Sequence, residues 1–311
     1  MNVLVTGGAG FIGSHLCDAL HERGHNITVV DNLVLGRIEN IRHLIGQPRF
    51  KFAQVDILDT DFMKIVFAEE NFDMVYHLAA NSDIQKGGQD PMVDYQMTFN
   101  TTFQILQLLK EFHIGKFFFA STSAIYGETR DVLHENYGPL CPVSNYGAGK
   151  LASEAFISAF SSMYHIQTWI TRFPNVVGER FTHGVIYDFI HKLRQNPHEL
   201  LVLGNGEQCK PYVYVKDLVD GILYVTDHAG ELYNVYLLGS NTRTKVRDIA
   251  AMVIEEMGLD ARIRYTGGDR GWVGDVPEFR YDLSKINALG WQAAHDSDAS
   301  VRLAIQKALG K

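Results

Sequence analysis

The sequence has few of the features that would point to a membrane, an oxidising compartment or nucleic acid. No apolar run approaches the roughly 20 residues that a membrane-spanning helix needs. The cysteines Cys17, Cys141 and Cys209 are odd in number and scattered, which is typical of reduced thiols in a cytosolic protein. Lys and Arg number 28 against 36 Asp and Glu. The resulting net charge of −8 disfavours a sequence-independent grip on nucleic acid or on an anionic membrane.

Internal repeats and low-complexity linkers are also lacking. Residues 2–5 already have the pattern of an apolar strand, so we expect no signal peptide and a cytoplasmic location. The composition, 46% hydrophobic and 21% charged, is that of an ordinary globular protein. A length of 311 residues suits one large α/β unit or two lobes that share a boundary.

The N-terminal segment combines a strand, a glycine-rich turn and a helix. An apolar run at 2–6 leads into Gly7-Gly8-Ala9-Gly10-Phe11-Ile12-Gly13, and a helix pattern follows. In this context Gly8 and Gly10 would let the backbone approach a pyrophosphate. Gly13 would let the helix pack closely on the strand, and the helix N-terminus would face the phosphates. The segment therefore predicts a dinucleotide-binding site.

The second strand, 27–30, ends at Asp31. A carboxylate at this point would accept hydrogen bonds from the adenosine ribose hydroxyls and would repel a 2′-phosphate. The sequence thus predicts NAD rather than NADP as the cofactor. The alternative role for Asp31 is to cap a helix or a turn.

One stretch matches the sequence pattern of a zinc site. His21-Glu22-Arg23-Gly24-His25 fits the H-E-x-x-H pattern of zinc peptidases, which needs a continuous helix to bring both histidines onto one face. Gly24 is typical of the residue that ends a helix, so we expect no metal site.

Further apolar runs predict the remaining strands of a parallel sheet, at 50–55, 72–78, 116–120 and 168–173, with a helix at 100–112. Asp56 and Ile57 end the third strand, where Asp56 either meets the adenine amino group or makes a turn. Small residues after the fourth strand, 79–82, would let a cofactor lie against the backbone. The fifth strand delivers Ser121-Thr122-Ser123 at its carboxyl end, where active groups of open parallel sheets gather.

The most distinctive stretch is Ser144-Asn145-Tyr146-Gly147-Ala148-Gly149-Lys150, followed by a helix pattern at 151–159. Side chains four residues apart lie on one face of a helix, so the ammonium of Lys150 would sit near the phenol of Tyr146. A positive charge there predicts that the pKa of Tyr146 falls from its ordinary ~10 toward neutrality. Such a pair could take a proton from a hydroxyl or return one. The same spacing also fits a surface tyrosine packed on a lysine stem.

Beyond residue 178 the alternation of strands and helices weakens. Helices are expected at 186–194, 217–227 and 246–257, and strands at 200–203, 211–215 and 261–265. We therefore predict an α/β fold, a Rossmann-type doubly wound parallel sheet with a smaller, interwoven C-terminal substrate lobe. Residues 1–173 would form the NAD-binding domain, with 211–240 returning to it. Residues 174–210 and 241–311 would form the substrate lobe.

Together these motifs resemble the extended short-chain dehydrogenase/reductase family, of the NAD-dependent nucleotide-sugar epimerase/dehydratase type that includes the UDP-glucose 4-epimerases. The matching pieces run nearly end to end. They are residues 6–14, 31–33, 77–80, Asn100, 121–127, 146–150, 172–178, 204–208, 214–217 and 274–277.

The resemblance implies a role for each matching residue. Tyr146 would be the acid/base, Lys150 would lower its pKa and hold the nicotinamide ribose, and Thr122 would hydrogen-bond the reacting sugar hydroxyl. Contacts with NAD are implied for Gly7, Gly10, Phe11, Ile12, Gly13, Asp31, Asn32, Asp56, Ile57, Leu78, Ala79, Ala80, Asn100, Tyr146, Lys150 and Phe173. Contacts with the nucleotide sugar are implied for Ser82, Thr122, Asn175, Gln208, Lys210 and Arg270.

Two positions depart from the family pattern. Lys210 stands where relatives usually carry an Arg for the diphosphate, which keeps the charge but loses the bidentate geometry. Many relatives have an Arg three residues before Asp275, where this chain has Trp272. Arg270, five residues before Asp275, is the alternative cation.

The resemblance implies a 4-epimerase, in which NAD takes a hydride from sugar C4 and returns it to the other face of a 4-keto sugar. Relatives that dehydrate carry Asp-Glu directly after the catalytic Thr, whereas this chain has Ser123-Ala124, which argues against a 4,6-dehydratase. A 4-dehydrogenase, a reductase or a decarboxylase stays open, as does a non-catalytic NAD-binding sensor. The nucleotide base and the sugar stay open as well.

Two predicted helices carry more apolar residues than one buried stripe needs. They lie around 97–112 and 149–164, and the extra residues include Phe99, Phe103, Leu106, Phe156, Phe160 and Met163. A helix that is apolar on two sides needs a second partner. Family members commonly pair these two helices with their copies, which implies a homodimer with a four-helix contact. Packing under neighbouring loops is the alternative.

Overall fold

The computed structural model describes residues 1–271 and 276–311, and the chain divides into two compact units. The first consists of Met1–Gly127, Leu140–Arg172 and Leu223–Tyr236, and the second of Glu128–Pro139, Phe173–Ile222 and Leu237–Lys311. The predicted boundaries differ, because they gave 128–139 and 211–222 to the first unit. These segments join the second unit through strand pairing: β6 (Val132–Leu133) pairs with β15 (Arg280–Tyr281), and β8 (Asn175–Val177) with β11 (Tyr212–Tyr214).

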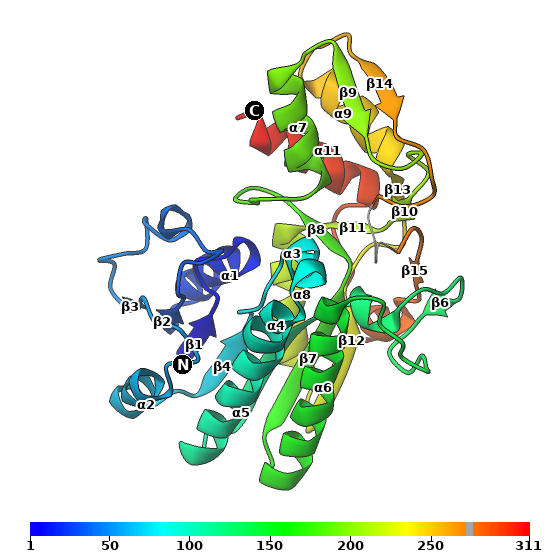
Figure 1. The fold of residues 1–311 in the computed structure, drawn as a ribbon. Coiled ribbons are helices and arrows are strands. Elements are labelled where there is room, and N and C mark those ends of the chain that lie inside the picture. Colours follow the sequence, from blue (N-terminus) through cyan, green and yellow to red (C-terminus); the bar gives the residue numbers. More distant parts are fainter. Residues whose placement is uncertain (272–275) are drawn as a thin grey trace. The chain divides into compact units, whose positions relative to one another are not determined.

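A seven-stranded sheet forms the centre of the first unit, in the order β12-β7-β5-β4-β1-β2-β3 (Figure 1). Its strands are β1 Asn2–Thr6, β2 Asn26–Val30, β3 Phe50–Ala53, β4 Met74–His77, β5 Lys116–Thr122, β7 Gln167–Phe173 and β12 Tyr233–Leu237. The pairs β2–β3, β1–β2, β1–β4 and β4–β5 are parallel. The strand order reverses between β1 and β4, which is the point where open α/β sheets bind ligands. The predicted Rossmann-type α/β fold is confirmed.

Helices α1, α2, α3, α4 and α6 of the first unit begin where the sequence offers a capping side chain or a glycine. The first unit contains α1 Phe11–Glu22, α2 Thr60–Glu69, α3 Ile84–Gln89, α4 Pro91–Asp94, a π-helical turn Tyr95–Asn100, α5 Thr101–Glu111, α6 Asn145–Tyr164 and 3₁₀ turns at Ile38–Asn40 and Ser123–Tyr126. Helix α6 begins before the predicted 151 because the Ser144 side chain accepts from the backbone N–H of Gly147. Tyr146 and Lys150 consequently lie in the first two turns of α6.

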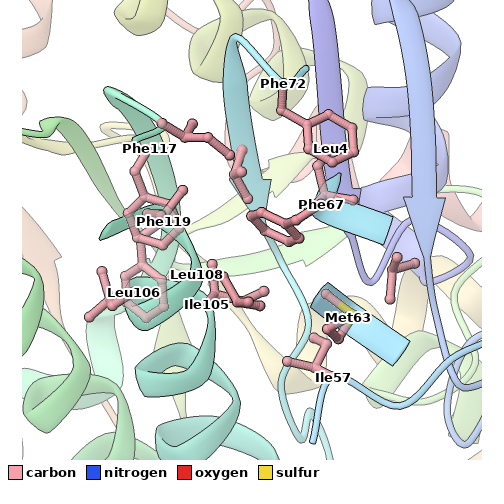
Figure 2. Packing of buried hydrophobic residues seen from close by; sticks show 14 of the residues in the cluster. Leu4, Ile57, Met63, Phe67, Phe72, Ile105, Leu106, Leu108, Phe117 and Phe119 are labelled. Atoms are coloured by element: carbon pink, nitrogen blue, oxygen red, sulfur yellow. The ribbon is translucent and has the colours of Figure 1, made fainter. Parts of the chain in front are cut away.

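Successive side chains of a strand point to opposite faces of the sheet, so the large side chains of β5 are divided between the two faces. On β5, Phe117 and Phe119 join the apolar core that α2 and α5 cover, as Figure 2 shows together with Leu4 and Phe67. Phe118 points to the other face and lies 5.5 Å, ring to ring, from Tyr76. Full burial of one such side chain contributes about 1.5–3 kcal/mol, so this strand is a large part of the unit's stability.

The second unit builds its core from helices and short strand pairs. Strand β9 (Glu199–Val202) pairs in parallel with β14 (Arg262–Tyr265), and β10 (Cys209–Lys210) pairs antiparallel with β13 (Thr244–Lys245). Helices α7 (Val185–Gln195), α9 (Val246–Glu256) and α11 (Ser297–Ala308) supply most of the buried apolar residues. The remaining helices are α8 (Val215–His228), which passes from the second unit into the first, and α10 (Ser284–Leu289). Across residues 1–271 and 276–311, none of the helices has the length and apolar character that crossing a bilayer requires.

Candidate active site

The glycine-rich turn after β1 packs backbone against backbone. Gly7 has φ +72°, and a Cβ there would lie 2.7 Å from the backbone N of Ala79, directly after β4. A Cβ on Gly13 would lie 2.2 Å from the carbonyl oxygen of Gly7, and one on Gly10 3.1 Å from the same oxygen. Helix α1 begins after Gly10, which has no side chain to cap the first N–H groups. These groups lack acceptors inside the helix and suit an anion such as a pyrophosphate.

Gly8 is required for packing on the neighbouring strand. A Cβ at Gly8 would lie 2.6 Å from Cγ1 of Val29 on β2. Any larger residue would therefore collide with β2, and the approach of the Gly8 backbone to a pyrophosphate stays a prediction.

The carboxylate of Asp31 is buried at the end of β2. Its Oδ2 accepts from the N–H of Ala9 at 3.0 Å and its Oδ1 from the N–H of Leu33 at 2.9 Å. Burial raises the pKa of Asp31, and these backbone hydrogen bonds oppose the rise. A carboxylate that the glycine-rich turn holds in place could accept hydrogen bonds from the hydroxyls of a ribose beside that turn.

Asp56 and Asn32 contact each other beyond the ends of β3 and β2. The side-chain amide of Asn32 donates to Oδ2 of Asp56 at 3.0 Å, and the N–H of Leu58 donates to Oδ1 of Asp56 at 2.9 Å. Asp56 therefore makes the turn that was its alternative role, and Ile57 after it is buried.

The hydroxyls of Thr122 and Tyr146 come together. Thr122 ends β5, and its Oγ1 accepts from the N–H of Ala124 at 3.1 Å. Tyr146 hydrogen-bonds with the Thr122 side chain. Lys150 is buried one turn further along α6, where its Nζ donates to the carbonyl oxygen of Ala120 at 2.7 Å. The predicted trio is therefore gathered at the carboxyl end of β5.

The predicted electrostatics of this trio are wrong. Burial raises the pKa of Tyr146 to about 12, and the hydrogen bond with Thr122 only partly opposes it. Burial also lowers the pKa of Lys150 to about 7. The Lys150 ammonium lies 5.9 Å from the centre of the Tyr146 ring and donates to a backbone carbonyl instead. Desolvation of the phenol, which the one-dimensional spacing does not reveal, is the largest cause of the shift.

A buried charged network adjoins the trio and was not anticipated from the sequence. Arg172, near the end of β7, forms an ion pair with Glu154 of α6 at 2.6 Å. The hydroxyls of Ser121 and Tyr126 complete the network. The one available signal was the spacing of Glu154, four residues after Lys150 on the same helix face.

The small residues after β4 form a second hydrogen-bonded group. The N–H of Leu78 donates to the carbonyl oxygen of Thr6 at 3.1 Å, which holds the 78–80 segment beside the glycine-rich turn. The N–H of Asn81 donates to Oγ1 of Thr98 at 3.3 Å, and its side chain donates to the buried carboxylate of Asp94 at 2.8 Å.

Ser82 and Asn100 lie near this group with different surroundings. Ser82 is exposed. Asn100 donates to the side chain of Gln96 at 2.8 Å, and its contact with NAD stays a prediction.

The remaining predicted positions belong to the second unit. Phe173 is buried at the end of β7, and Asn175 is exposed at the start of β8. Gln208 is buried just before β10, and Lys210 is buried on β10. Arg270 donates to both carboxylate oxygens of Glu128, at 3.0 and 2.9 Å. Trp272, Gly274 and Asp275 lie outside the described residues.

The H-E-x-x-H stretch does not bring its histidines onto one helix. Helix α1 ends at Glu22, and Gly24 has φ +81°. His21 contacts the carbonyl oxygen of Pro48 through Nε2 at 3.0 Å, while His25 begins the next segment. The helix end that Gly24 predicted is confirmed.

Comparison with known proteins places this geometry among sugar-nucleotide enzymes. The model of the NAD-dependent epimerase/dehydratase family matches residues 3–239. A provisionally named UDP-glucose 4-epimerase of Methanocaldococcus jannaschii is 32% identical over 306 residues, covering 96% of each chain. The dTDP-D-glucose 4,6-dehydratase of Homo sapiens is 30% identical over 306 residues, or 93% of this chain and 85% of that one. The structure of UDP-glucose 4-epimerase with UDP-glucose from Thermotoga maritima has a TM-score of 0.90 at 30% identity, covering 100% of this chain and 99% of that chain.

Proposed function

The chain belongs to the NAD-dependent epimerase/dehydratase family, and from this premise we propose that it catalyses the 4-epimerisation of a nucleotide-diphosphate sugar, with a UDP-sugar as the first candidate. Similar proteins include two UDP-glucose 4-epimerases, one of them solved with UDP-glucose. A dehydratase is similar at nearly the same identity, so similarity alone does not choose the reaction. The choice rests on this chain's own residues.

NAD is the cofactor of the family, and the residues of the first unit fit it. The glycines of the 7–13 turn let it pack closely where a Cβ would collide with the protein's own atoms, and the uncapped N-terminus of α1 suits a diphosphate. Asp31 is fixed at the end of β2, where a ribose hydroxyl needs an acceptor. Lys150 and the 78–80 segment lie at the carboxyl ends of β5 and β4, which suits the nicotinamide half.

The proton chemistry is assigned to Tyr146 and Thr122. Their hydrogen bond brings two hydroxyls to one point, so a sugar hydroxyl there can exchange a proton with the Tyr146 oxygen while Thr122 orients it. NAD, when bound, would supply the hydride acceptor and donor for the sugar carbon, and its positive charge would favour the phenolate form of Tyr146. Lys150 adds positive charge on the same side, held in place by the carbonyl of Ala120.

The observation that carries the proposal is the combination of this hydroxyl pair with the residues that follow Thr122. Ser123 and Ala124 begin a 3₁₀ turn and offer no carboxyl group for removing water from the sugar. That argues against dehydration and leaves oxidation and reduction at one carbon. Asn175, Gln208, Lys210 and Arg270 are the candidates for binding the nucleotide sugar in the second unit.

The proposal is tested by incubating the purified protein with UDP-glucose, UDP-N-acetylglucosamine, UDP-glucuronic acid and dTDP-glucose without added reductant. An epimer that reaches equilibrium with the substrate, with no net NADH, supports a 4-epimerase. Net NADH would indicate a dehydrogenase, a 4-keto-6-deoxy product a dehydratase, and release of CO₂ a decarboxylase. NAD binding without turnover of any sugar would favour a sensor.

Asp31 is expected to set the choice between NAD and NADP. Asp31→Asn keeps the shape of the side chain and removes the charge that repels a 2′-phosphate, so the preference for NAD should narrow by about tenfold. Affinities for both cofactors can be compared by calorimetry. Asp59→Asn is the control, because Asp59 caps α2 by accepting from the N–H of Phe62 and an Asn can do the same. Equal affinity of the unmodified protein for NAD and NADP would reject this role of Asp31.

We further propose a homodimer that pairs α5 and α6 with their copies. The two helices lie side by side in Figure 1, and Phe103 of α5 lies 5.2 Å, ring to ring, from Phe156 of α6. Phe99, in the turn before α5, lies 5.4 Å from the same ring. Phe156 and Met163 are still 41% and 67% exposed, which leaves apolar surface for a second copy. Leu106, in contrast, is fully buried inside the first unit.

A cytoplasmic location remains part of the proposal, in keeping with the free thiols of all three cysteines.

Light scattering should therefore give twice the chain mass of 35.0 kDa at micromolar concentration. Phe156→Glu should weaken the dimer, because a carboxylate would be buried without a partner. Phe62→Glu is the matched control, since Phe62 is 46% exposed on α2 of the same unit. A single-chain mass for the unmodified protein would contradict the dimer.

A further inference from the structure

The buried network beside the candidate catalytic trio is fully hydrogen-bonded. Nε of Arg172 donates to both carboxylate oxygens of Glu154, at 3.0 and 3.2 Å, and Nη2 donates to Oε2 at 2.6 Å. Nη1 donates to the hydroxyl of Tyr126 at 2.9 Å. The hydroxyl of Ser121 donates to Oε1 of Glu154 at 2.5 Å. All four residues are at most 6% exposed, so water contributes little to their solvation.

Each member of the network is next to a residue of the proposed site. Ser121 precedes Thr122 on β5, and Glu154 follows Lys150 by one turn of α6. Arg172 comes late in β7, and Tyr126 closes the 3₁₀ turn that starts after Thr122. The network therefore fastens β5, α6 and β7 to one another at the end of the sheet where the proposed chemistry takes place.

Stability alone does not explain such a pair. Removing an ion pair from water costs about as much as the attraction returns, and well-packed apolar residues of similar volume often stabilise a fold as much or more. What a bidentate guanidinium–carboxylate pair does provide is a fixed orientation, because two parallel hydrogen bonds allow one relative geometry. One hydroxyl on each partner, Ser121 on Glu154 and Tyr126 on Arg172, restricts that geometry further.

We propose that the Glu154–Arg172 pair positions the site: through Ser121 it holds Thr122 in hydrogen-bonding distance of Tyr146 and beside Lys150. This inference rests on the proposed function, because it assigns the network to the same proton-transfer site. Glu154 and Arg172 are positioning residues, since neither is assigned a contact with the reacting atoms.

The charge of Glu154 has a second consequence that a purely structural role would not have. Burial lowers the pKa of Lys150, and the negative charges of Glu154 and Asp94 oppose that effect. Near neutral pH the phenol of Tyr146 is uncharged, because burial raises its pKa to about 12. The imidazole of His77 is also uncharged there, because burial lowers its pKa to about 3. Loss of Glu154 should therefore lower the pKa of Lys150 further, so that the ammonium is lost at a lower pH.

The test is a double variant, Glu154→Met with Arg172→Met, which removes both charges and keeps much of the volume. Its melting temperature should be close to that of the unmodified protein, as for other apolar replacements of buried ion pairs. Its kcat should fall about ten- to hundred-fold with a smaller change in KM, because misplaced reacting groups slow the chemistry more than they weaken binding. The basic limb of the pH profile of kcat should move to lower pH.

Two further variants keep the inference open to refutation if the double variant folds poorly. Ser121→Ala removes only the link from Glu154 to β5 and should lower kcat with little change in melting temperature. Met63→Ala truncates a fully buried core residue of α2, and should lower the melting temperature while leaving kcat unchanged. Unmodified kcat and pH profile in the folded double variant, or unmodified kcat in Ser121→Ala, would overturn the positioning role.

Failure of the inference and failure of the proposed function give different results. An unmodified protein that epimerises no sugar rejects the proposed function. In that case crystal structures still decide the inference: the double variant should show the Thr122 and Tyr146 hydroxyls apart, and an intact hydrogen bond would overturn it. An active unmodified protein with an equally active double variant rejects only the positioning role.

Discussion

Tyr146→Phe should lower kcat by at least ~10²–10⁴-fold while NAD stays bound, because the substitution removes the one oxygen assigned to proton transfer and keeps the ring. The ring itself packs at the start of α6, so the fold and the cofactor site are expected to survive. The measurement is single-turnover and steady-state epimerisation of the best sugar in the panel, with the NAD content of each preparation determined after denaturation.

The matched control for this prediction is Tyr164→Phe, in the last turn of the same helix. Tyr164 packs on Phe160 and beneath the ammonium of Lys110, 4.8 Å from the ring centre, which a phenylalanine preserves. Its kcat should match that of the unmodified protein. Turnover near the unmodified value in Tyr146→Phe would remove the tyrosine from the mechanism, and loss of NAD from the variant would mean that the phenol serves binding instead.

The fold was predictable because its signals are local. Apolar runs bounded by glycine and polar residues mark β1, β2 and β5, and the spacing of strands and helices dictates a parallel sheet. The order of the glycines also marked the cofactor turn, since the steric demand at Gly13 comes from Gly7 and Gly8 of the same turn, whereas the demand at Gly7 comes from the distant Ala79. Boundaries were less certain where caps decide them, as Ser144 does for α6.

What the sequence did not reveal depends on burial and on distant contacts. The direction of the pKa shift of Tyr146 is set by desolvation, which exists only after the chain has folded around the phenol. Glu154 and Arg172 are separated by 18 residues and lie on different elements, so no local pattern links them. The assignment of 128–139 to the second unit likewise follows from the pairing of β6 with a strand near the C-terminus.

The glycine-rich turn predicts the second large effect, in Gly13→Ala. An alanine normally favours a helix over glycine by about 1 kcal/mol, so propensity alone would stabilise α1. Here the new Cβ would lie 2.2 Å from the carbonyl oxygen of Gly7, and that backbone must move. Overpacking of this kind costs about 1–3 kcal/mol, which, taken from the cofactor site, corresponds to roughly a 5- to 150-fold loss of NAD affinity.

Calorimetric titration of the NAD-free protein measures that loss, and Gly88→Ala is the control. Gly88 is also helical, on α3, but a Cβ there meets nothing within 4 Å, so the alanine should leave NAD affinity unchanged and raise the melting temperature slightly. Equal NAD affinity in Gly13→Ala and the unmodified protein would show that the turn can yield without disturbing the cofactor. The close approach of α1 to the Gly7 carbonyl would then be a packing contact, and the pyrophosphate would have to be held by other groups.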